Sequence, residues 1–166
     1  DLSKGMAQKV QFIVTTLHDP DLLIFDEPFS GFDPVNTSII RQEILELKKK
    51  GVSIIFSTHR MESVEEICDE ITLINNGQSI ISGNITDIKT DFKDNTFKCI
   101  LSTEHLSLDK KYKIIDQKEN EFIIQITDDS TPNELIESII KQNNIIYFSE
   151  RIPSMEEIFI KSVNNE

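Results

Sequence analysis

The sequence has 166 residues, enough for one domain or two small ones, and its 38% apolar and 28% charged residues are ordinary for a globular protein. Its formal net charge of -12 argues against a nucleic-acid surface, because binding to phosphates draws mainly on clustered Lys and Arg. No window approaches the roughly 18 apolar residues of a membrane span, and no basic segment followed by an apolar one opens the chain as a secretory signal would.

The chain begins with a predicted helix and a predicted strand. Four apolar residues recur at the spacing of one helix face, namely Val10, Ile13, Val14 and Leu17. We expect Ser3 to cap this helix and Asp19-Pro20 to end it. The run Leu22–Phe25 is predicted as a strand buried on both faces of a parallel sheet, since four consecutive apolar residues suit that position.

A second helix and strand follow. Pro34 at a first helical position and Gly51 past the end bound the helix, and the basic run 48–50 suits its last turn. Its apolar face consists of Ile40, Ile44 and Leu47. The next apolar run, Val52–Ser57, predicts a second buried strand.

A short acidic helix and an edge hairpin are predicted next. Met61–Cys68 forms the helix, and the strands Glu70–Ile74 and Gln78–Ser82 flank Asn75-Asn76-Gly77, a strong two-strand turn signal. The polar segment Asn84–Asp94 is interpreted as a short helix and a linker.

From Asn95 onward the pattern changes to short strands. We predict them at Thr96–Leu101, Tyr112–Ile115, Phe122–Thr127 and Ile145–Ser149, with a polar turn over 116–120. Between the last two strands, Thr131 and Glu134 have capping-box spacing at the start of a helix, with Pro132 in its first position. The inward-facing residues of this helix are expected to be Leu135, Ile136, Ile139 and Ile140.

A final helix, Met155–Val163, follows a second capping-box pair, Ser154 and Glu157. These elements predict a second, small α+β domain. The two cysteines, Cys68 and Cys99, lie in no metal-ligand spacing and are interpreted as unpaired structural thiols of a reducing cytoplasm.

Two adjacent carboxylates, Asp26 and Glu27, follow the first apolar strand. The carboxyl ends of parallel strands are where such sheets bind ligands, so this pair suits a magnesium and water site. Magnesium keeps much of its hydration shell and uses few carboxylates, so we expect Asp26 to hold it through water. Glu27 is then placed to orient or deprotonate an attacking water. A surface or helix-capping acid pair is the competing interpretation, which the apolar strand before the pair disfavours.

Leu2-Ser3-Lys4-Gly5-Met6 resembles the signature sequence Leu-Ser-Gly-Gly-Gln of ATP-binding cassette (ABC) ATPases. Three further motifs of that family follow in family order: Leu22–Pro28 resembles a Walker B strand, Ser30-Gly31-Phe32-Asp33 a D-loop, and Ser57-Thr58-His59 a segment with a switch histidine. Considered without the other motifs, Ser3 is typical of an ordinary N-cap and Asp33-Pro34 of a helix start. His59 by itself is typical of a structural histidine. The order and spacing favour the family interpretation.

The resemblance implies a role for each motif. Ser3, Lys4 and Gly5 would contact the ATP phosphates held by a partner subunit, since a helix N-terminus offers unpaired amides and partial positive charge. Asp33 would be the acidic member of the D-loop, and His59 would touch the terminal phosphate as a hydrogen-bond partner. Lys4 and Met6 depart from the usual Gly and Gln.

The sequence contains no Gly-x-x-x-x-Gly-Lys-Ser/Thr, the phosphate-cradling Walker A loop. We therefore expect the fold class to be α/β: the C-terminal part of a P-loop NTPase (ABC ATPase) parallel-sheet domain over residues 1–90, followed by the α+β domain over 95–166. Alone, this chain is expected to be inactive. The ending Ile152–Phe159 resembles the C-terminal extension of exporter-type ABC ATPases.

The resemblance implies an ATPase subunit that uses ATP and Mg²⁺, pairs with a second copy, and drives a separate membrane permease. It would lie in the cytoplasm, peripheral on the inner face of the cell membrane, with no nucleic acid as partner. Two alternatives remain: a soluble ABC ATPase that acts on ribosomes or DNA, and a non-enzymatic dimerisation or docking fragment. Twin cassettes or basic extensions would favour the former, and neither occurs here.

Overall fold

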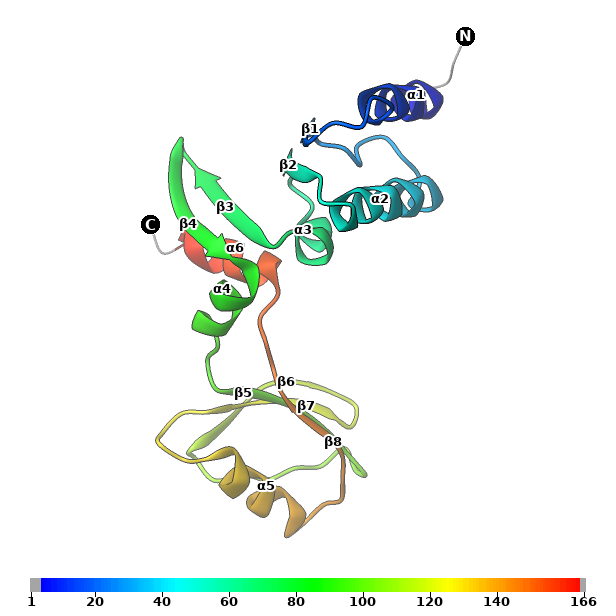
Figure 1. Ribbon diagram of the computed structural model, residues 1–166. Helices are drawn as coiled ribbons and strands as arrows, with labels where there is room; N and C mark the ends of the chain where they lie inside the picture. The colour runs from blue at the N-terminus through cyan, green and yellow to red at the C-terminus, as the bar shows by residue number, and fades with distance from the viewer. Residues whose placement is uncertain (1–3, 165–166) are drawn as a thin grey trace. The chain divides into compact units, whose positions relative to one another are not determined.

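The computed structural model describes residues 4–164 of the chain, which falls into one unit ending at Ile71 and another beginning at Thr72. The first unit contains a parallel strand pair with helices. Its elements are α1 (Lys4–Thr16), β1 (Leu22–Asp26), α2 (Pro34–Lys49), β2 (Ser53–Ser57) and α3 (Met61–Ile67), labelled in Figure 1. Each predicted element of this part is confirmed to within three residues at its ends, and the predicted Ser3 cap of the first helix lies outside the described residues.

Strands β1 and β2 pair in parallel, from Leu22 opposite Ser53 to Asp26 opposite Ser57. Helix α2 is the crossover that such a parallel pair requires. Asp33 caps it, Pro34 occupies its first turn, and Gly51 follows it with a φ of 91°, which glycine adopts without strain. The paired strands therefore end at the same edge.

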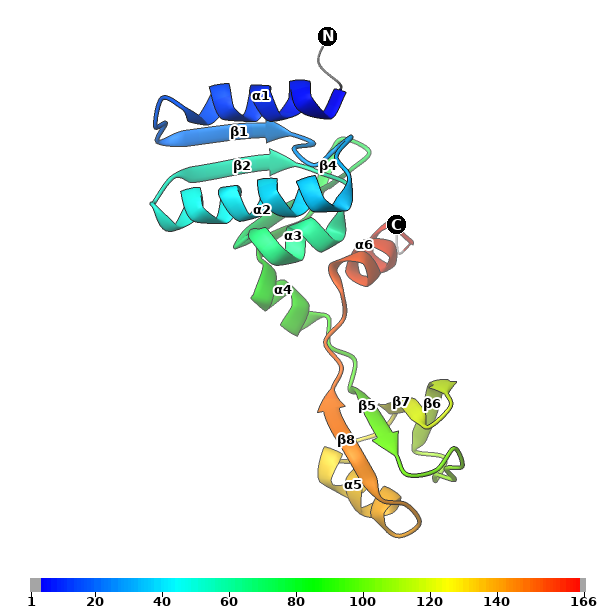
Figure 2. The same ribbon diagram turned by 90° about the vertical axis from the view of Figure 1, so that its right-hand side faces the viewer.

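Both helices α1 and α2 pack on one face of this strand pair (Figure 2). The hydrophobic cluster that forms the core of this unit is centred on the buried side chains of Phe29, Ile40, Ile44 and Ile67. Phe12 of α1 stacks on Phe25 of β1 with 5.6 Å between the ring centroids. The large aromatic side chains of α1 and the strands thus supply much of the contact.

The prediction that these strands are buried on both faces is wrong for this chain. Leu22, Ile24 and Ile55 point away from the cluster and are 50%, 69% and 58% exposed. The expected inward face of the first helix is also exposed, at Val10, Ile13, Val14 and Leu17. Successive side chains of a strand point to opposite faces, so Phe25 reaches the cluster while Leu22 and Ile24 point away from it. On α1, Phe12 lies on a different face of the helix from the four exposed residues, and that face packs on the cluster.

The second unit begins within a hairpin of β3 (Glu70–Asn75) and β4 (Gln78–Asn84). Asn76 and Gly77 have φ of 47° and 77°, the two positive values of the predicted turn. Helix α4 (Ile85–Asp91) follows, capped by the Asn84 side chain. The later elements are β5 (Thr96–Leu101), β6 (Tyr112–Lys118), β7 (Glu121–Ile126), α5 (Pro132–Ile140), β8 (Ile145–Glu150) and α6 (Met155–Asn164).

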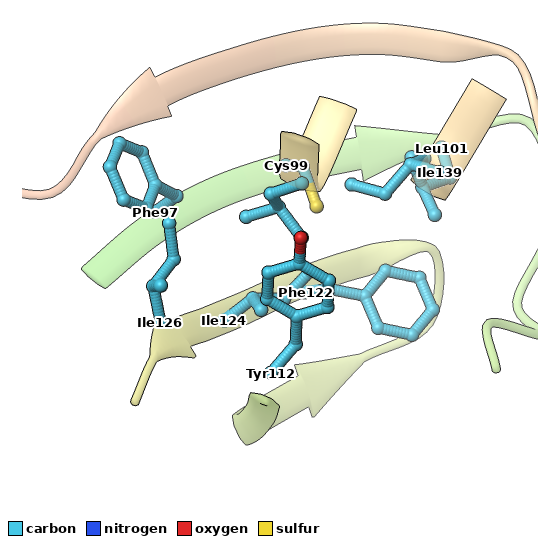
Figure 3. Close-up of a cluster of buried hydrophobic side chains, with 9 residues drawn as sticks. Phe97, Cys99, Leu101, Tyr112, Phe122, Ile124, Ile126 and Ile139 are labelled. Carbon is cyan, nitrogen blue, oxygen red and sulfur yellow. The ribbon is translucent and has the colours of Figure 1, made fainter. Parts of the chain in front are cut away.

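Strands β5 to β8 form a four-stranded antiparallel sheet in the order β6-β7-β5-β8. Helix α5 covers one face of it, and Figure 3 shows the side chains gathered there from β5, β6 and β7. The members of this core are Phe97, Cys99, Leu101, Tyr112, Phe122, Ile124, Ile126, Leu135 and Ile139. Burial raises the pKa of the Cys99 thiol to about 11, and both cysteines are free, as predicted.

Two details of this unit differ from the sequence prediction. Strand β6 continues to Lys118, so the turn is confined to Glu119 and Asn120 and not spread over 116–120. Pairing with β7 extends the strand, because the polar side chains of an edge strand remain in water. On α5, Ile140 is 57% exposed, since a nine-residue helix lays only Leu135 and Ile139 fully on the sheet.

Both predicted capping boxes are confirmed. At α5 the Thr131 side chain accepts from the Glu134 backbone N–H, and the Glu134 carboxylate accepts from the Thr131 N–H at 2.7 Å. Before α6, Ser154 and Glu157 make the same reciprocal pair at 2.9 and 3.2 Å. These local interactions define where the last two helices begin.

Candidate active site

The acid pair lies at the carboxyl end of β1, beside the carboxyl end of β2. Asp26 is opposite Ser57, whose hydroxyl donates to Asp26 Oδ1. The Glu27 backbone N–H donates to the Ser57 carbonyl at 3.0 Å, and Glu27 itself has a φ of 46°. A non-glycine residue in this left-handed region is uncommon. The surrounding hydrogen bonds therefore hold the Glu27 backbone in a conformation that is unfavourable on its own.

Both oxygens of the Glu27 carboxylate are held by the residues after β2. The His59 backbone N–H donates to Oε1 at 2.9 Å, and His59 Nδ1 lies 2.7 Å from the same oxygen. The Thr58 hydroxyl donates to Oε2 at 3.1 Å. An ionised carboxylate only accepts hydrogen bonds, so His59 Nδ1 carries its proton in this arrangement.

The same contacts affect the pKa of Glu27. Partial burial of the carboxyl raises its pKa, but hydrogen bonds from His59 and Thr58 outweigh that effect, so the pKa is lowered overall. The side chain remains 31% exposed. Glu27 is therefore an ionised, oriented carboxylate that solvent can reach.

Asp26 is exposed beside Glu27. Residues 4–164 contain no cluster of three or more side chains suited to holding a metal ion. Magnesium can be bound by one or two carboxylates with waters and phosphates completing its shell, so one exposed carboxylate fits that mode. The assignment of Asp26 to magnesium stays a prediction.

The turn after the acid pair is anchored on two sides. Phe29 is buried and meets Phe56 of β2 edge to face, with 6.1 Å between the centroids. The Ser30 N–H donates to the Glu27 carbonyl at 3.0 Å, and the Gln8 side-chain amide of α1 donates to the Ser30 carbonyl at 2.6 Å. Sequence reasoning missed Gln8, because its partner is a backbone carbonyl, which every residue possesses.

Asp33 is the N-cap of α2. Its carboxylate accepts from the Asn36 backbone N–H at 2.9 Å and from the Asn36 side-chain amide at 2.5 Å. The backbone hydrogen bond from Asn36 is the main cause that lowers the pKa of Asp33. The helix-start interpretation of Asp33 is thus confirmed, and its part in a D-loop stays a prediction.

The two roles of Asp33 can be separated by substitution. Asn caps a helix as well as Asp does, whereas Ala does not. We expect Asp33→Asn to leave the melting temperature of the chain unchanged and Asp33→Ala to lower it, measured by circular dichroism. If the charge also serves the D-loop, Asp33→Asn will lower ATP hydrolysis in the gene product that carries this chain. Equal melting temperatures for Asp33→Ala and the parent would contradict the capping role.

The signature residues are placed only in part. Ser3 lies outside the described residues, and Lys4 is the first residue of α1. Gly5 follows in the first turn, where a Cβ atom would meet nothing within 4 Å. Within residues 4–164, the hydrogen bonds of Asp26 and Glu27 reach Ser57, Thr58 and His59 but not Gly5. The phosphate roles of Ser3, Lys4 and Gly5 stay predictions.

The parallel strand pair with its helices makes the first unit part of an α/β domain, with the acid pair at the carboxyl end of its strands. Two family models match parts of the chain: residues 1–65 match an AAA domain described as a putative AbiEii toxin of a type IV TA system, and residues 83–163 match the C-terminal domain of DrrA1-3-like ATP-binding proteins.

Individual relatives are ATP-binding proteins of ABC transporters. The chain is 38% identical to an uncharacterized one of Alkalihalophilus pseudofirmus, across 98% of this chain and 62% of that protein. It is 38% identical to a fluoroquinolones export ATP-binding protein of Mycobacterium tuberculosis, across 52% of this chain and 29% of that protein. A solved ATP-binding subunit of an ABC transporter matches 55% of this chain and 38% of its own, with 38% identity and a TM-score of 0.51.

The chain belongs to the ABC transporter ATP-binding proteins and matches their C-terminal portion. It spans about three fifths of the length of the Alkalihalophilus relative. Within residues 4–164, no helix has both the length and the apolar character that crossing a membrane requires.

Proposed function

We propose that this chain is part of the ATP-binding and ATP-hydrolysing subunit of an ABC transporter, which couples ATP hydrolysis to a separate membrane permease. The observation that carries the proposal is the Glu27 carboxylate, held at the carboxyl ends of two parallel strands by Thr58 and His59. Similarity to a fluoroquinolones export ATP-binding protein supports an exporter.

Each residue of the cluster has a role in this proposal. Glu27 orients or deprotonates the water that attacks the terminal phosphate, and His59 contacts that phosphate as a hydrogen-bond partner. Asp26 would hold Mg²⁺ through water, and a bound ion would supply neutralisation of charge on the phosphates. The ionised state of Glu27 supports its role, because only the carboxylate form can accept a proton from water.

The proposed subunit acts as a pair with a second copy of itself. Ser3, Lys4 and Gly5 would then contact ATP held by the partner subunit, while Glu27 and His59 serve the subunit's own site. The subunit would lie on the cytoplasmic face of the membrane, bound to the permease. The exposed apolar side chains of β1 and β2 support a further layer packed on their open face, since a parallel sheet is normally covered on both faces.

The domain assignment of 1–90 and 95–166 is part of the same proposal. The small α+β domain would be the C-terminal extension of the subunit, with its own core between the four-stranded sheet and α5.

The experiment that tests this function uses the native gene product that carries the sequence. Its intact mass and its ATPase activity are measured with magnesium and with a chelator. We expect a protein longer than 166 residues that hydrolyses ATP only when magnesium is present. A gene product that binds no nucleotide would contradict the proposal and leave the docking interpretation.

A further inference from the structure

Thr58 makes two hydrogen bonds through its one hydroxyl group. The hydroxyl oxygen accepts from the Arg60 backbone N–H at 3.1 Å, and the hydroxyl donates to Glu27 Oε2 at 3.1 Å. A backbone N–H can only donate and an ionised carboxylate can only accept, so the direction of both bonds is determined. The single hydroxyl hydrogen of Thr58 is therefore directed at Glu27.

The contact adds a restraint at the second oxygen of the carboxylate. Both hydrogen bonds from His59 reach Oε1 and leave Oε2 without a contact from that residue. Rotation about the terminal bond of the side chain moves both oxygens, so a hydrogen bond to Oε2 opposes it together with those to Oε1. That torsion is broad in glutamate, with no strongly preferred staggered position. Thr58 holds the second oxygen from a partly buried position and so completes the restraint on the orientation of the plane.

The backbone on either side of this contact is itself fixed. The Glu27 N–H bonds to the Ser57 carbonyl, and Thr58 follows β2 directly. A carboxylate has about four acceptor sites, and the three hydrogen bonds from Thr58 and His59 account for about three of them. Another hydrogen-bond donor can therefore approach the carboxylate from only a narrow range of directions.

We propose that Thr58 is a positioning residue for ATP hydrolysis, which holds the Glu27 carboxylate in the orientation from which it meets the attacking water. This inference rests on the proposed function. Misorientation of a catalytic group slows the chemical step while leaving substrate binding unchanged, because Thr58 acts through Glu27 and not on the nucleotide.

The test compares Thr58→Val and Thr58→Ser in the full gene product. Valine has the shape of threonine without the hydroxyl, and serine keeps the hydroxyl. We expect T58V to lower kcat about tenfold, the effect of losing one hydrogen bond to a charged group, with KM for ATP unchanged. T58S should recover most of that loss. Equal kcat for T58V and the parent, or equal losses for T58V and T58S, would overturn the inference.

Two further measurements separate an effect of T58V through Glu27 from an effect that does not involve Glu27 and from unfolding of the variant. In a Glu27→Gln background, T58V should cause no additional loss of the residual hydrolysis, since its action runs through Glu27; a full tenfold loss there would overturn the inference. Melting temperatures of the variants control for unfolding. If T58V does not fold, Thr58→Cys, of similar size and with only a weak donor, replaces it with the same expectation.

The outcomes also distinguish this inference from the proposed function. A parent protein without magnesium-dependent hydrolysis overturns both. A parent protein that hydrolyses ATP and loses activity on Glu27→Gln, but is unaffected by T58V, overturns only the role of Thr58.

Discussion

Replacing Glu27 by Gln in the full gene product is expected to lower ATP turnover by a factor of about 100 or more, while ATP binding is retained. The amide of glutamine cannot accept a proton from water, and its nitrogen cannot accept the hydrogen bond that Oε2 receives from Thr58. The shape of the side chain is preserved, so the contact between the His59 backbone N–H and the remaining oxygen can persist.

The measurement is steady-state hydrolysis with magnesium, alongside ATP binding at equilibrium. The matched control is Glu43→Gln, because Glu43 is an exposed carboxylate on α2. The control should keep the parent rate. Continued hydrolysis by Glu27→Gln near the parent rate would show that another group activates the water.

The second large effect concerns the core of the four-stranded sheet. Phe122 is fully buried in β7, between its neighbours Cys99 on β5 and Gln117 on β6. Truncating a buried Phe to Ala removes its transfer free energy and leaves a cavity, which together cost about 3–5 kcal/mol. Small domains are stable by only about 5–15 kcal/mol, so we expect Phe122→Ala to unfold this unit or leave it marginal.

This prediction is tested on the 166-residue chain by urea denaturation, followed by circular dichroism. The matched control is Ile123→Ala on the same strand, because Ile123 is on the opposite face of the sheet and is only partly buried. The control should destabilise the chain less. A cost below about 1 kcal/mol for Phe122→Ala would mean that this core is not tightly packed.

Several features of the fold follow from short stretches of sequence. The two capping boxes, Pro34 at the start of α2, and the Asn76-Gly77 turn were all predicted where the structure has them. Each depends on residues within three or four positions of one another, so its energetics can be judged without the rest of the chain. The position of the acid pair directly after an apolar strand is of the same kind.

The failures concern which face of an element is covered. The apolar spacing of α1 predicted one buried face, but Phe12 packs on Phe25 and leaves Val10, Ile13 and Val14 exposed. A hydrophobic pattern shows that a side chain prefers to be buried. It does not show whether a neighbouring element lies there to bury it, which depends on packing between distant segments.

The sequence by itself determined the order of the elements, their caps, the motifs of the ABC family and the adjacency of Asp26 and Glu27. Only the tertiary structure decided how the Glu27 carboxylate is held, because Thr58 and His59 are 31 and 32 positions away along the chain. They meet Glu27 once β1 and β2 pair in register, with Asp26 opposite Ser57. Hydrogen bonds require atoms within about 3 Å of each other, and strand pairing is what brings these distant residues that close.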